Sequence, residues 1–80
     1  MHELGVLRYV VRTVAQVAKE NKIEKIKFVT LEVGTESSYV PHYLHKLFPI
    51  AVKYYPNIGE PELKLIRVPG RGLHIKELGY

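Results

Sequence analysis

The sequence contains no cysteine. This absence excludes disulfides, thiolate catalysis, cysteine-ligated zinc and iron–sulfur clusters, and it is compatible with a reducing compartment such as the cytoplasm. The sequence also lacks an apolar run long enough to cross a bilayer, and its first residues do not have the pattern of a signal peptide. We therefore expect a cytoplasmic protein with no membrane span and no bound zinc.

The sequence has no segment in which basic residues or acidic residues are concentrated. The 80 residues include 12 Lys or Arg and 8 Asp or Glu, for a formal net charge of +4. Acidic residues stand among the basic ones, whereas a nucleic-acid footprint gathers cations on one face or element. We expect no nucleic-acid partner. A chain of this length forms one domain over residues 1–80 with a thin core, which a homodimer would help to stabilise.

Two segments have the periodicity of amphipathic helices. Apolar residues recur at helical spacing over residues 4–18, which predicts a helix that begins at about residue 3 or 4 and ends near residues 21–22. A second helix is predicted from Pro41, with an apolar stripe from Val40 to Tyr55. Pro49 lies inside this segment, where it removes a backbone donor and predicts a kink.

Three further segments are typical of strands. Residues 26–33 precede Gly34, and alternation places Val29, Leu31 and Val33 on one face of the first strand.

Residues 62–68 and 73–78 follow, joined by a Pro-Gly-Arg-Gly turn at residues 69–72 that suggests a β-hairpin. The order α-β-α-β-β predicts an α+β fold, a two-layer sandwich with two helices on one face of a three-stranded sheet.

The first three residues, Met1, His2 and Glu3, form a candidate chelate. The bulky His2 disfavours removal of Met1, so we expect the α-amine of Met1, the amide nitrogen of His2 and the His2 imidazole to be available together. Binding one metal ion, they close fused five- and six-membered rings, and planar nitrogen coordination favours Ni(II) or Cu(II). Glu3 offers a carboxylate, an amide nitrogen or a favourable charge at the helix start. On its own, such a terminus is more often frayed and solvated.

Four segments of the sequence form a recognisable set. They are Met-His-Glu-Leu at residues 1–4, the strand ending in glycine at residues 29–34, Val-Pro at residues 40–41, and the segment from Glu62 to Arg71. In these segments the sequence resembles the HypA-type hydrogenase nickel-incorporation family, and the resemblance extends over almost the whole chain. Members of the family carry a zinc module with two Cys-x-x-Cys pairs after the second strand, and here the final strand follows at once. The resemblance therefore implies a short form that lacks the zinc module, with the expected insertion point near residues 70–73.

The resemblance implies a metallochaperone and not an enzyme. Such a protein binds Ni(II) transiently for maturation of [NiFe]-hydrogenase, or of urease, beside a maturation GTPase and the hydrogenase large subunit. By the same resemblance, His2 is the principal nickel ligand, with the Met1 amine, and Glu3 acts as a ligand or supports one. The alternative is an interaction or oligomerisation module of the same family with a vestigial nickel site.

The remaining histidines and the tyrosines are weaker candidates. His42 and His45 share a face of the predicted second helix and could bind one metal ion together. Both lie off the apolar stripe, and no carboxylate is one turn away, so a solvated face is the favoured interpretation. His74 stands beside the turn at residues 69–72 and is considered as an additional nickel ligand, although a strand-surface histidine is the simpler interpretation. Four of the six tyrosines lie around the second helix. Aromatic residues of this kind favour a protein–protein interface over base stacking.

Overall fold

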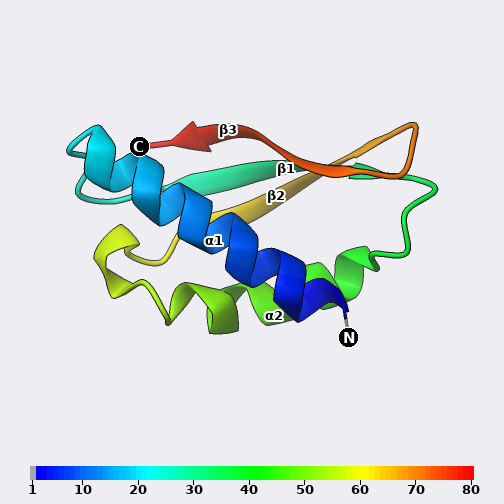
Figure 1. Cartoon of the computed structure of the whole chain (residues 1–80), viewed down its shortest axis with the longest axis horizontal. Coiled ribbons are helices and arrows are strands. Elements are labelled where there is room, and N and C mark those ends of the chain that lie inside the picture. The colour runs from blue at the N-terminus through cyan, green and yellow to red at the C-terminus, as the bar shows by residue number, and fades with distance from the viewer. Residues whose placement is uncertain (1) are drawn as a thin grey trace.

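The computed structural model describes residues 2–80, with the backbone alone described for His2. Within these residues the elements are α1 (His2–Glu20), β1 (Phe28–Gly34), α2 (Pro41–Val52), the 3-10 helix η1 (Pro56–Ile58), β2 (Glu62–Val68) and β3 (Leu73–Gly79). Figure 1 shows α1 and α2 together on one side of the sheet, with α1 running diagonally along it. The predicted α+β fold, with two helices packed on a three-stranded sheet in the order α-β-α-β-β, is confirmed.

α1 is amphipathic along its length. One stripe faces the sheet and consists of the buried residues Leu7, Val10, Val11, Val14, Ala15 and Ala18. Burial of such a stripe, at roughly 25 cal/mol per Å² of apolar surface, stabilises a helix more than intrinsic propensity does. The helix ends after Glu20, and Lys22 follows with a positive φ of 56°. This end agrees with the one predicted from the periodicity.

β1 is the central strand of the sheet, in the order β2-β1-β3. It pairs in parallel with β2 and antiparallel with β3. The expectation of a hairpin between the last two strands is therefore wrong. Parallel strands need a crossover connection, and α2 with η1 supplies it between β1 and β2. After β2, residues 69–72 cross the end of β1, and β3 returns along its other edge.

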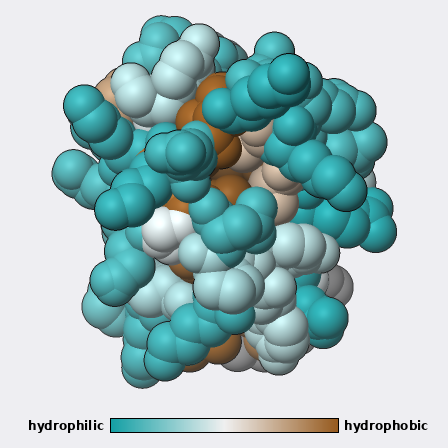
Figure 2. Space-filling model, turned by 90° about the vertical axis from the view of Figure 1, so that its left-hand side faces the viewer, coloured by the Kyte–Doolittle hydropathy of each residue, from teal (hydrophilic) through white to brown (hydrophobic). Residues whose placement is uncertain are grey.

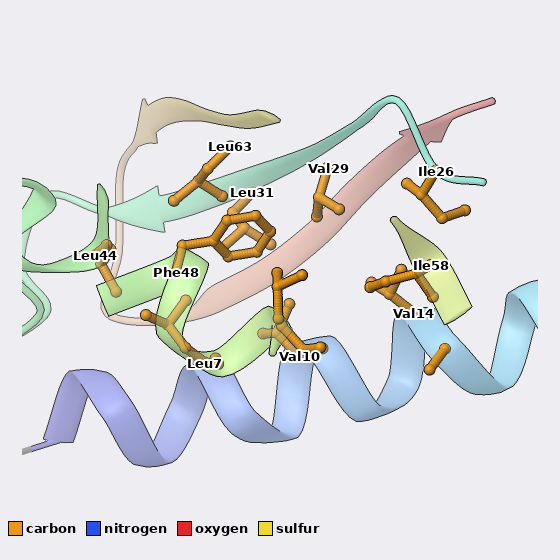
Figure 3. Close-up of a cluster of buried hydrophobic side chains, with 14 of the residues drawn as sticks. Leu7, Val10, Val14, Ile26, Val29, Leu31, Leu44, Phe48, Ile58 and Leu63 are labelled. Atoms are coloured by element: carbon orange, nitrogen blue, oxygen red, sulfur yellow. The ribbon is translucent and has the colours of Figure 1, made fainter. Parts of the chain in front are cut away.

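The core lies between the helices and one face of the sheet. As predicted, Val29, Leu31 and Val33 share that face, and all three are fully buried. Figure 3 shows side chains of α1, α2 and the strands pointing toward one another in this layer, with Leu31 near Phe48. Figure 2 views the end of the molecule that carries the C-terminus, where hydrophobic side chains are visible between hydrophilic ones.

α2 is shorter than its apolar pattern. It ends at Val52, and a turn at residues 53–54 separates it from η1. Pro49 lies inside the helix on its exposed side. Val40, which was included in the core stripe, is 42% exposed at the N-cap position. The side chains that do enter the core are Leu44, Phe48, Ala51 and Val52.

Candidate metal centre

The predicted chelate lies at the first turn of α1. Met1 and the side chain of His2 are outside the described residues, so the site is built here from the backbone of His2 and from Glu3. α1 begins at His2. The first four backbone N–H groups of a helix have no acceptor within the helix. The intrahelical hydrogen bonds of α1 therefore do not require the N–H groups of His2 and Glu3 as donors.

Glu3 joins the start of α1 to the start of α2. Its side chain is only 6% exposed, and its Oε2 accepts a hydrogen bond from the backbone N–H of Val40 at 3.0 Å. Val40 is the N-cap residue of α2 and makes no side-chain capping bond of its own. The carboxylate thus lies at the positive end of the α2 dipole, where negative charge is favourable. This contact holds the turn that carries the predicted ligands against the second helix.

The sequence contained an indirect signal for this contact. A helix that begins Val-Pro at residues 40–41 has no Ser, Thr, Asp or Asn at its N-cap, so its first N–H groups need an acceptor from elsewhere. Nothing in the pattern indicated that Glu3, 37 residues away, provides it. Only the packing of α1 beside α2 brings the two together.

His74 lies on the other face of the sheet. It is exposed, and it pairs across the strands with Glu32. Directly opposite residues share a face, and the face of Glu32 is opposite to that of Leu31 and Val33, which point to the helices. The sheet therefore separates His74 from α1, and His74 is not part of the site proposed below.

His42 and His45 are both exposed on α2. The His42 ring lies beside the ring of Tyr43, with centroids 5.8 Å apart. No group of three or more His, Cys, Asp or Glu side chains placed to hold a metal ion occurs in the described part of the chain. These two histidines agree with the solvated-face interpretation.

Comparison with known proteins identifies the family. A family model described as hydrogenase/urease nickel incorporation, metallochaperone, hypA matches residues 1–73. The chain belongs to the HypA family. No curated protein matches the sequence. The matched region of this HypA-family chain includes the first turn of α1 and both helices, and it ends at the first residue of β3. None of the helices within residues 2–80 has the length and apolar character of a membrane span.

Proposed function

We propose that this protein binds Ni(II) at its N-terminus and delivers it during maturation of [NiFe]-hydrogenase or urease. The observation that carries the proposal is the HypA-family match, which begins at residue 1 and so includes Met1, His2 and Glu3. The ligands are the α-amine of Met1 and the amide nitrogen and imidazole of His2. Their five- and six-membered chelate rings suit a planar nitrogen-rich Ni(II) complex.

The placement of the site at a helix start has two electrostatic consequences. The positive end of the α1 dipole opposes a cation, but it also favours loss of an amide proton. Deprotonated amide nitrogen then supplies the negative charge that the metal requires. Because protons leave as Ni(II) binds, affinity rises with pH.

Glu3 acts as a positioning residue in this proposal. Its Oε2 is engaged by the Val40 N–H, and its side chain is buried, so it holds the first turn of α1 in place. Its amide nitrogen, next along the backbone, is the candidate for a fourth planar donor. A site with few protein ligands keeps a position open, which a carrier needs in order to pass its metal to the next protein.

The proposal includes no zinc. The chain has no cysteine, and the family match ends at residue 73, where the zinc module is expected to have been inserted. The connection at residues 69–72 is closed on the end of β1 by backbone hydrogen bonds, including Glu36 N–H to Gly70 O at 2.9 Å. This closed connection supports the proposal of a short form without the zinc module. A maturation GTPase and the hydrogenase large subunit are the partners proposed for delivery.

Titration calorimetry with Ni(II) tests the proposal. The protein is produced without an N-terminal tag, and mass spectrometry establishes that Met1 is present and unacetylated. We expect binding at micromolar Kd or tighter, equivalent to about −8 kcal/mol or more, and a loss of at least ~100-fold in His2→Ala. His42→Ala is the matched control, because it removes an exposed imidazole elsewhere, and it should bind as the wild type does. Equal binding by wild type and His2→Ala would refute the nickel site.

A further inference from the structure

α2 and the turn that follows it carry a second apolar stripe, in which Leu47 is partly buried against the core and the other residues are exposed. It is defined by Tyr43, Leu47, Ile50 and Tyr54, which recur at intervals of four, three and four residues, and it is called the outer stripe below. Tyr43 and Ile50 are each 44% exposed, and Tyr54 is 59% exposed. Exposed apolar residues scattered singly are ordinary, whereas a continuous stripe marks a contact surface. Within α2, the spacing of Tyr43, Leu47 and Ile50 is that of a helix seam which packs against another helix, and Tyr54 extends the stripe into the turn at residues 53–54.

The outer stripe continues onto α1. The Arg8 guanidinium lies 4.7 Å from the centroid of the Tyr54 ring, and the Arg12 guanidinium lies 5.5 Å from that of Tyr9. Tyr9 is itself 60% exposed. Figure 1 shows α1 and α2 next to each other on the same side of the sheet. The two helices therefore present one surface, in which aromatic and aliphatic side chains stand beside two arginines.

A groove lies within this surface. It is lined by Gly5, Arg8, Tyr9 and Arg12 of α1 and by Tyr55, and its volume is about 320 Å³. The missing side chain of Gly5 helps to keep it open, since a Cβ there would meet nothing within 4 Å. The surface is thus hollowed between α1 and the segment that follows α2, and a hollow of this kind suits the docking of an elongated partner segment.

The charges around the outer stripe have one sign. Lys46 on α2 and Lys53 directly after it flank the stripe, and Arg8 and Arg12 flank it on α1. No Asp or Glu occurs in residues 4–19 or 41–55. Among the described residues, the contacts of these arginines are with tyrosine rings and not with carboxylates. A partner that buries this surface must supply the negative charge.

We propose that the outer stripe and the Arg8–Arg12 groove dock an amphipathic helix of a partner protein, one whose apolar seam is flanked by Asp and Glu. A second copy of this chain fits poorly, because a two-fold dimer sets the same patch against itself and brings the four cations of each copy together. Nucleic acid fits poorly as well, since Leu47 and Ile50 at the centre of the stripe offer no ring for stacking on bases. The inference does not depend on the nickel site.

Fluorescence anisotropy with synthetic helical peptides tests the proposal. The probe is a labelled amphipathic peptide with leucines at positions i, i+3 and i+7 flanked by glutamates, and the matched probe carries lysines in place of the glutamates. We expect the acidic peptide to bind at least ~10-fold more tightly than the basic one, and the difference to shrink when ionic strength rises from about 0.05 M to 0.5 M.

Paired variants locate the binding surface. Ile50→Ser and Lys53→Glu should each weaken binding of the acidic peptide by ~10-fold or more. Their matched controls, Ile66→Ser and Lys76→Glu, change exposed residues on the strands and should leave the affinity within ~2-fold. Circular dichroism verifies that every variant is folded, and Ni(II) affinity should be unchanged in all four.

Several results would overturn the proposal. They are equal binding of the acidic and basic peptides, equal effects of the stripe variants and their controls, or no peptide binding at all. If the protein forms a stable homodimer and Ile50→Ser dissociates it, the outer stripe serves self-association instead. A third outcome is that the peptide fails to bind, whereas a single-stranded RNA oligomer binds in a salt-sensitive way and Lys53→Glu abolishes that binding. This outcome would assign the outer stripe to nucleic-acid binding.

Discussion

Gly34 is a residue at which any side chain would collide with neighbouring backbone atoms. It ends β1 under the connection between β2 and β3, and a Cβ built on it would lie 2.2 Å from the carbonyl oxygen of Gly70 and 2.9 Å from the amide nitrogen of Arg71. Both neighbours are backbone atoms, and the Gly34 N–H donates to Gly72 O at 2.7 Å. The close approach of two chain segments thus requires a residue without a side chain.

We expect Gly34→Ala to lower the free energy of unfolding by about 2–4 kcal/mol, because the connection must move and its hydrogen bonds must lengthen. Urea denaturation followed by circular dichroism measures the change. Gly5→Ala is the control, since that position in α1 is exposed and open, and it should gain up to ~1 kcal/mol from helix propensity. A loss below ~0.5 kcal/mol in Gly34→Ala would contradict the close packing of the crossing.

At the scale of the elements, one carboxylate couples the two helices. Glu3 accepts the N–H of Val40 and so completes the start of α2 from the first turn of α1. α2 begins without a polar N-cap of its own. The start of α2 therefore depends on the packing of α1 beside it. In turn, the hydrogen bond from Val40 holds the first turn of α1, where the metal site is proposed, against α2.

Glu3→Ala should destabilise the protein by about 1.5–3 kcal/mol, the range for a hydrogen bond to a charged group. It should also accelerate hydrogen exchange of the Val40 amide more than exchange of amides in β1. Amide exchange followed by NMR checks both expectations. Glu24→Ala removes an exposed glutamate and serves as control, with an expected change within ~0.5 kcal/mol. Unchanged exchange at Val40 in Glu3→Ala would mean that the contact does not protect the helix start.

The strand order shows where local patterns stop being informative. Two glycines between residues 69 and 72 correctly indicated a chain reversal, but a reversal does not specify which strand the returning segment pairs with. β1 has both edges available, and pairing each edge with a different strand buries the most backbone and side-chain surface. The alternation in β1 did predict its buried face, because that face depends only on side chains two residues apart.

At the scale of the whole molecule, stability rests on one thin core. Leu31 is fully buried at its centre, on the middle strand and beneath both helices. Leu31→Ala should cost about 2–5 kcal/mol, a large share of the roughly 5–10 kcal/mol expected for a small domain. Each kcal/mol corresponds to roughly 4–8 °C in Tm at this size, so Tm should fall by at least ~8 °C.

Ile66→Ala provides the comparison for this core variant. Ile66 lies on β2 with its side chain 37% exposed, so its truncation should cost roughly 0.5 kcal/mol or less and lower Tm by no more than ~4 °C. Similar Tm changes in Leu31→Ala and Ile66→Ala, measured by circular dichroism, would show that the two faces of the sheet contribute equally. That result would contradict a single core between helices and sheet.

The sequence by itself determined the two helices and three strands, the buried faces of α1 and β1, and the residues of the proposed chelate. Periodicity is a local property, and Met1, His2 and Glu3 are covalent neighbours whose donors need no folding to come together. Only the tertiary structure decided that β1 lies between β2 and β3, that Val40 binds Glu3, and that His74 is on the far face. These relations depend on which apolar faces bury each other, and that is settled by the packing of all elements at once.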